Sequence, residues 1–68
     1  MSVRDLLLSC GNIKSHTFVT IVNVKGEQIF KDKFSTLMDN ENPQIILLLK
    51  SEVDYFKVFE KSGIVILI

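Results

Sequence analysis

The stretch Ser62–Ile68, SGIVILI, decides how this fold is built, because five consecutive apolar residues follow a glycine. In a strand, alternate side chains point to opposite faces. The apolar residues therefore divide into two rows, with Ile64, Ile66 and Ile68 on one face and Val65 and Leu67 on the other. Neither row is polar enough to serve as a solvent face, so we expect cover on both sides of this strand.

The segment before it, residues 51–63, has two interpretations. It could be a helix with a capping box at Ser51 and Asp54, ending at Gly63, or the strand EVDYFKVF followed by a turn at EKSG. We favour the hairpin, because a βαβ unit usually needs about 30 residues, whereas 24 run from Ile45 to Ile68. The strand would have two faces: Val53, Tyr55 and Lys57 on one, and Asp54, Phe56 and Val58 on the other.

The first half of the chain predicts a helix and a hairpin. Ser2 and Asp5 match a capping box ahead of a helix over about 3–10, which Gly11 would end in a left-handed conformation. The β-branched run TFVTIVNV (17–24) and the segment EQIFKDKF (27–34) flank Gly26, the residue expected in a tight, bulged turn. Lysines on the second strand mark it as an edge.

The middle of the chain is a second helical region. Ser35–Met38 fits a single helical turn, and PQIILLLKS (43–51) fits a helix with Asn42 as its N-cap and proline at its first position. Length and apolar content alone also allow a buried strand over 45–49; the Asn-Pro start favours the helix. The prediction is one α+β domain over 1–68, of order α-β-β-α-β-β. Its four-stranded, mainly antiparallel sheet carries two short helices on one face.

Composition excludes several classes of function. The chain has 68 residues, 47% hydrophobic and 24% charged, which is typical of a globular domain. Eight basic and eight acidic residues give no net charge, so we do not expect duplex nucleic acid as a partner. Leu6–Leu8 is too short an apolar run for a signal peptide or a membrane span, and the lone Cys10 suits a reducing interior. We expect no membrane partner and a location in the cytoplasm of a bacterial host.

The residue types that carry chemistry form no recognisable constellation. His16 has no nucleophile or orienting acid at a familiar spacing, and Cys10 reads as a small buried hydrophobe. Asp39 and Glu41 resemble a calcium loop only faintly, because the glycine and the distal glutamate of such a loop are missing. We therefore predict no enzyme activity, no cofactor and no metal site.

Three segments carry a resemblance to known proteins: VRDLLLSCGN (3–12), VNVKGEQIF (22–30) and SEVDYFKVFEKSGIVILI (51–68). They resemble short proteins common in phages and mobile elements of Gram-positive bacteria, which share a leading helix, a hairpin with a charged glycine turn and an apolar ending. Some small phage proteins of this size act against bacterial immune systems. The resemblance implies a fold and a biological setting, and it transfers no site residue.

An uncovered sheet face predicts a partner. With helices on one face, apolar side chains of the closing hairpin are left on the other, and the interface we expect comprises Tyr55, Phe56, Val58, Ile64, Ile66 and Ile68. A second copy is the favoured cover, through stacked sheets or through edge-to-edge pairing of terminal strands in a two-fold dimer. The alternative is that the loop Asp39–Pro43 folds over this face.

Two functions fit these expectations. The first is a non-enzymatic interaction protein that binds and blocks a host component such as a bacterial defence protein. The second is an oligomeric sponge that encloses a small anionic signal nucleotide at its subunit junctions, with Lys25, Lys31 and Lys33 as possible anion contacts.

Overall fold

The computed structural model describes residues 1–11, 13–39, 41–61 and 63–68. It has the predicted α+β architecture, with two helices between the hairpins. The elements run in the order α1 (Val3–Ser9), β1 (Phe18–Val22), β2 (Gln28–Lys33), α2 (Phe34–Met38), α3 (Pro43–Leu49), β3 (Tyr55–Phe59) and β4 (Gly63–Leu67).

The four strands form one open sheet in the order β2-β1-β4-β3. Each predicted hairpin is present as an antiparallel pair, β1 with β2 and β3 with β4. The hairpins join through β1 and β4, which run parallel. Strand β4, the last strand along the chain, therefore lies inside the sheet and is hydrogen-bonded on both sides. A dimer formed by edge-to-edge pairing through this strand is excluded. The edges are β2, as predicted, and β3.

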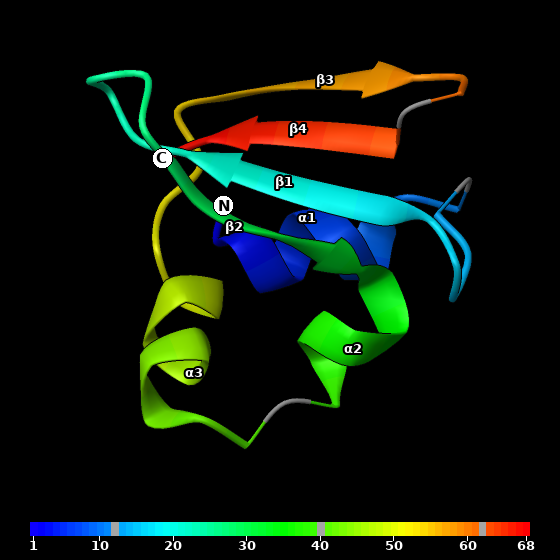
Figure 1. Cartoon of the computed structure of the whole chain (residues 1–68), viewed down its shortest axis with the longest axis horizontal. Coiled ribbons are helices and arrows are strands. Elements are labelled where there is room, and N and C mark those ends of the chain that lie inside the picture. The colour runs from blue at the N-terminus through cyan, green and yellow to red at the C-terminus, as the bar shows by residue number, and fades with distance from the viewer. Residues whose placement is uncertain (12, 40, 62) are drawn as a thin grey trace.

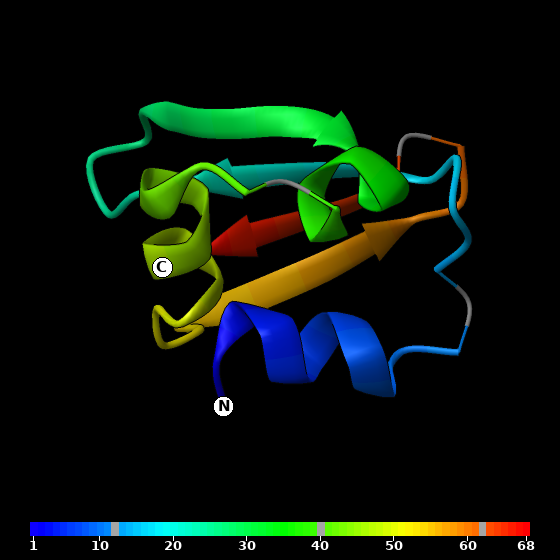
Figure 2. The same cartoon turned by 90° about the horizontal axis from the view of Figure 1, so that it is seen from below.

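All three helices lie on one side of the sheet (Figures 1 and 2). The sequence predicted two helices and a helical turn at 35–38; that turn is α2, which begins one residue earlier. The buried core comes from the helices and from the two central strands: Val3, Leu6, Leu7, Val19, Ile21, Leu37, Leu49, Ile64 and Ile66.

Local signals account for most helix boundaries. The capping box of α1 is present, with the Asp5 N–H donating to Ser2 Oγ at 3.1 Å and the Ser2 N–H donating to Asp5 Oδ2 at 3.3 Å. The predicted left-handed end at Gly11 is wrong, because the backbone of Gly11 does not have a positive φ. Instead, α1 ends at an extended Cys10 whose N–H donates to the Leu6 carbonyl. This backbone bond replaces the expected glycine cap.

The two open choices of the sequence are resolved. Residues 43–49 form helix α3, begun by Asn42, whose Oδ1 accepts from the Gln44 N–H at 2.9 Å, and by Pro43. Residues 55–59 form strand β3, so the hairpin interpretation is confirmed. The bulged turn is also confirmed: Gly26 has a φ of 84°, and the β1–β2 register shifts between Ile21 and Val22.

Strand β4 lies in the middle of the sheet and is apolar on both faces. Ile64 and Ile66 are fully buried, beside Val19 and Ile21 of β1. Val65 and Leu67 point the other way and are half-buried. Ile64 and Ile66 are core residues, so their expected place on a partner interface is corrected: the helices of the same chain cover their row.

Candidate binding surface

The sheet face opposite the helices, called the outer face below, is built from three cross-strand rows. The register aligns Lys33 with Phe18 and Phe59 with Gly63 in the first row, and Lys31, Thr20, Val65 and Lys57 in the second. Val22, Leu67 and Tyr55 form the third. These residues alternate with the buried Val19, Ile21, Ile64 and Ile66, which fixes the face they occupy.

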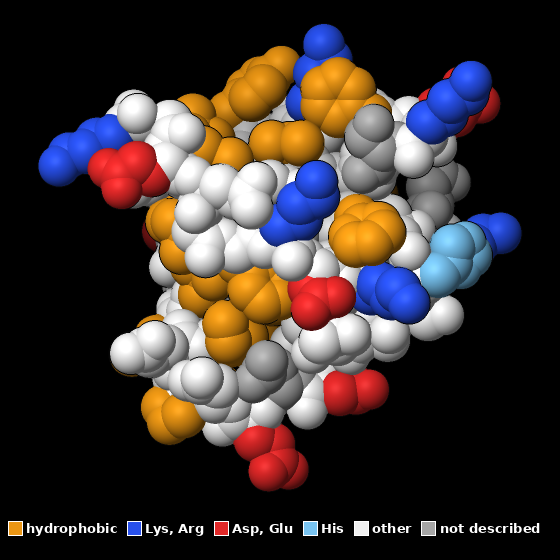
Figure 3. Space-filling model, in the orientation of Figure 1, with side chains coloured by type: hydrophobic (Ala, Val, Ile, Leu, Met, Phe, Trp, Pro, Cys, Tyr) orange, Lys and Arg blue, Asp and Glu red, His pale blue; other side chains and the backbone are white. Residues whose placement is uncertain are grey.

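This outer face is apolar and aromatic. Phe18, Tyr55 and Phe59 are 43%, 62% and 41% exposed, while Val65 and Leu67 between them are half-buried. Figure 3 looks onto this side, where hydrophobic side chains gather over β3 and β4. The end of α2 and the start of α3, which bound the loop Asp39–Pro43, both lie on the helix side of the sheet (Figure 1). Within the residues that the structure describes, this loop does not cover the outer face, so that alternative is wrong; Asn40 lies outside the described residues.

The charges on the outer face are all positive. Lys31, Lys33 and Lys57 stand at strand positions of this face, and the Lys57 Nζ lies 5.3 Å from the centroid of the Phe59 ring. The one acidic residue within the four strands, Asp32, pairs with Val19 and so belongs to the helix side. The outer face therefore suits an apolar partner with acidic groups at its rim.

The predicted site residues divide between the two faces. Tyr55 lies on the outer face, opposite Leu67. Phe56 and Val58 lie on the helix side, opposite Ile66 and Ile64, but are still 41% and 45% exposed because the helices cover this edge incompletely. Ile68 follows β4, is half-buried against the core, and donates its N–H to the Val22 carbonyl at 3.0 Å.

The predicted anion contacts are not one cluster. Lys31 and Lys33 share the outer face, whereas Lys25 lies in the β1–β2 turn, at the other end of β2 from Lys33. Sequence reasoning missed Phe18, Lys57 and Phe59 as members of this surface. The signal was present in their two-residue alternation, but it could be used only once the register with β1 and β4 was known.

The candidate chemical residues stay dispersed. His16 is exposed and Cys10 is half-buried. Among the described residues there is no pocket and no group of three or more His, Cys, Asp or Glu side chains that could hold a metal ion. No helix in the described ranges is long and apolar enough to cross a membrane.

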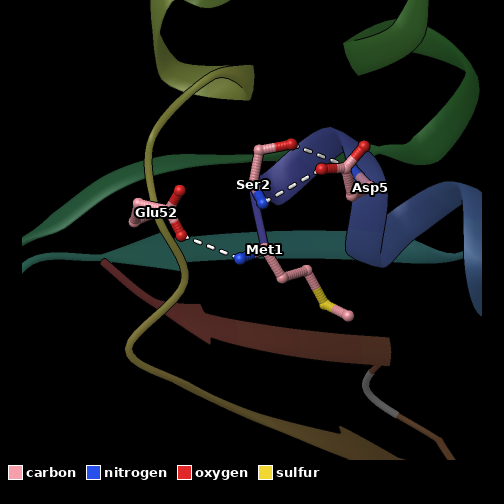
Figure 4. Close-up of polar contacts among 4 residues, drawn as sticks. All are labelled: Met1, Ser2, Asp5 and Glu52. Carbon is pink, nitrogen blue, oxygen red and sulfur yellow. Dashed lines mark hydrogen bonds and ion pairs between the residues drawn. The ribbon is translucent and has the colours of Figure 1, made fainter.

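One polar cluster ties the first residues to the segment before β3 (Figure 4). The Met1 ammonium donates to Glu52 Oε2 at 2.8 Å, and the hydrogen bond and charge of Glu52 raise the pKa of that ammonium. The hydrogen bonds from Ser2 lower the pKa of Asp5. Met1, Asp5 and Glu52 are exposed and Ser2 is half-buried, so the cluster orders the start of α1 and is not a buried reaction centre.

The chain is a small α+β domain whose open four-stranded sheet carries helices on one face and aromatic side chains on the other. No family model, curated protein or solved structure matches this chain.

Proposed function

We propose that this protein is a non-enzymatic interaction protein, encoded by a phage or mobile element, that binds a host component such as a bacterial defence protein. It acts by steric occlusion: the bound chain covers the surface that the host component needs for its own partner. The outer face is the binding surface, and the setting rests on the resemblance to small phage proteins.

The observation that carries this proposal is the uncovered outer face. Phe18, Tyr55 and Phe59 expose aromatic surface at the ends of its rows, and aromatic side chains are enriched where protein interfaces derive most of their binding energy. Burying one large apolar side chain contributes about 2 kcal/mol. A face with several such side chains gains enough free energy on contact for a specific complex.

The lysines define the chemistry of the partner. Lys31, Lys33 and Lys57 provide a local positive field on a chain whose total net charge is zero, and such a field steers association with an acidic surface. We therefore propose that the host protein presents an apolar patch bordered by carboxylates.

The test compares two charge reversals in bacteria that each carry one defence system. The protein is expressed in these strains, and phage plating efficiency is measured together with the proteins retained on the tagged chain. We expect one system to be blocked by the wild type and not by the outer-face double variant Lys31→Glu/Lys33→Glu. The control Lys14→Glu/Lys50→Glu carries the same charge change elsewhere, in a loop and after α3, and should act as the wild type. Equal behaviour of both double variants contradicts the proposal.

A second candidate function is the nucleotide sponge, favoured by the lysines that stand beside aromatic rings. A ring such as Phe59 can stack on a base while Lys57 or Lys33 contacts phosphate. Native mass spectrometry of protein purified from infected cells separates the two candidates. A bound mass of nucleotide size supports the sponge, and its absence together with a bound protein supports occlusion.

A further inference from the structure

Strand β3 has one strand neighbour, β4, and α1 and the N-terminal residues lie near its other side (Figure 2), where the Val53 N–H donates to the Met1 carbonyl just before the strand begins. It lies at the edge of the sheet, and all five of its residues, YFKVF, are exposed. Tyr55, Phe56, Val58 and Phe59 retain exposures of 62%, 41%, 45% and 41%. Because β3 is an edge strand, the backbone N–H and C=O groups on its outer side have no strand partner. Apolar side chains lie on both faces of the strand beside these backbone groups.

The other edge is protected. Strand β2 carries Lys31, Asp32 and Lys33 in succession, and a register shift interrupts its pairing with β1. Charges and bulges are the devices that keep edge strands from pairing with other chains. Strand β3 has no bulge in its register and a single charge, Lys57. The contrast within one sheet indicates that the β3 edge is kept open for pairing.

We propose that β3 pairs antiparallel with β3 of a second copy across a two-fold axis, so that two four-stranded sheets become one continuous sheet. This inference goes beyond the proposed function, because it uses the edge of the sheet and leaves the outer face of each copy free. In Figure 2, the β3 side of the sheet is bordered by α1 and not by another strand.

Symmetry restricts the register of this pairing. A two-fold axis perpendicular to the sheet keeps each side chain on its own face, so a residue can only oppose one an even number of positions away. Centring the pair on Lys57 sets Tyr55 against the partner's Phe59 on the outer face. It also sets Phe56 against the partner's Val58 on the helix side. Every apolar residue of β3 then has an apolar partner.

The cost of this register is one pair of like charges, Lys57 against its symmetry mate. Centring the pairing on Phe56 removes the lysine pair but sets Asp54 against Val58 of the other copy. Centring it on Val58 sets Glu60 against Phe56. Symmetry makes each of these unfavourable pairs occur twice. Cross-strand pairs between aromatic and β-branched residues each contribute roughly 0.2–1 kcal/mol, and a like-charge pair costs a similar amount. Four apolar pairs against one repulsive pair favour the Lys57-centred register.

We expect the free edge of β3 to pair with a second copy of this chain. A strand that completes β3 must be apolar on both faces, because Tyr55 and Phe59 lie on one face while Phe56 and Val58 lie on the other. Strand β3 of another copy meets this requirement, with matching length and alternation. A two-fold pairing also closes on itself, so it gives a dimer and not a fibre.

The first experiment is charge exchange across the axis, followed by sedimentation equilibrium. The single variants Tyr55→Lys and Phe59→Glu should each weaken dimerisation by at least ~10-fold, because each places two charges against aromatic rings. The double variant Tyr55→Lys/Phe59→Glu should regain most of the affinity, since opposite charges then face each other twice. Circular dichroism checks that each exposed substitution leaves the chain folded.

The second experiment is disulfide capture in a Cys10→Ser background. Lys57→Cys places two thiols opposite each other at the axis, at a Cβ separation of about 4.5–5.5 Å before adjustment, and mild oxidation should give a covalent dimer. Lys31→Cys is the matched control, an exposed outer-face position on the protected edge, and should give no covalent dimer under the same conditions.

Each other outcome counts against the proposal. A wild-type chain that stays monomeric up to millimolar concentration overturns it, and so does a dimer whose affinity is unaffected by Tyr55→Lys and Phe59→Glu. A dimer weakened by both single variants but not restored by the double variant overturns the Lys57-centred register. Equal oxidation of Lys57→Cys and Lys31→Cys indicates random collision and contradicts pairing through β3.

Discussion

Gly63 is the residue on which the β3–β4 hairpin depends. Its φ is +94°, and a Cβ built there would clash with the backbone carbonyl of Phe18. We expect Gly63→Ala to destabilise the chain by about 2 kcal/mol or more, because the left-handed conformation alone costs a residue with a Cβ roughly 1–2 kcal/mol. Urea unfolding followed by circular dichroism measures the change.

Gly26 provides the matched control for that substitution. It has a similar φ of +84°, but nothing lies within 4 Å of a built Cβ. Gly26→Ala should therefore lose only the conformational term, about 1 kcal/mol. An equal decrease in the free energy of unfolding for Gly63→Ala and Gly26→Ala would show that the close approach of β1 to Gly63 does not contribute to the effect of the substitution.

Asp5 gives the start of α1 a dependence on acid. Its pKa is lowered from 3.8 by the hydrogen bonds from Ser2, so its ionised form stabilises the folded chain. That contribution is complete above pH 3.8 and is lost as the pH falls through the lowered pKa. We expect Asp5→Asn to be less stable than the wild type at pH 7, and this difference to shrink as the pH falls below 3.8. Thermal melts across this range check the convergence, with the exposed Glu41→Gln as the control.

At the scale of single elements, the two sheet edges differ in how they are protected. The double variant Lys31→Val/Lys33→Val removes the lysines that protect β2. Because β2 then loses two of the three charges that protect its edge, we expect some association beyond the proposed β3–β3 dimer, measured by light scattering against protein concentration. Lys14→Val/Lys50→Val removes as much charge from exposed positions outside the strands and should leave the assembly unchanged.

Local signals in the sequence predicted most of the elements and left the faces of the closing hairpin undecided. The Asn-Pro start identified α3, and the serine–aspartate pair identified α1. Strand β4 is apolar on both faces, so its alternation cannot say which row is internal. The answer comes from β1, whose buried Val19 and Ile21 align with Ile64 and Ile66. That register is a long-range contact and has no local signature.

At the scale of the whole molecule, the parallel contact between β1 and β4 explains the apolar run Ile64–Ile68. Two hairpins could meet through any of their edges, and sequence patterns do not rank these choices. The observed choice buries the most apolar strand of the chain in the centre and leaves β2 and β3 outside. It also leaves one complete sheet face without helices, and both proposed surfaces are consequences of that arrangement.

The free energy of unfolding of this small domain should increase with protein concentration. A chain of 68 residues has a limited core, here nine buried hydrophobic side chains among the described residues. If β3 pairs as proposed, each tenfold rise in protein concentration above the dissociation constant adds about 0.7 kcal/mol per chain to the free energy of unfolding. This is half of the roughly 1.4 kcal/mol that corresponds to a tenfold change in an equilibrium constant, because two chains share each pairing. That corresponds to a rise in Tm of about 3–5 °C. Calorimetry over a hundredfold range of concentration should show this rise for the wild type, whereas the Tm of Tyr55→Lys should begin to rise only at a concentration at least ~10-fold higher. A flat Tm for both would mean that each chain is stable alone and that the open β3 edge has another purpose.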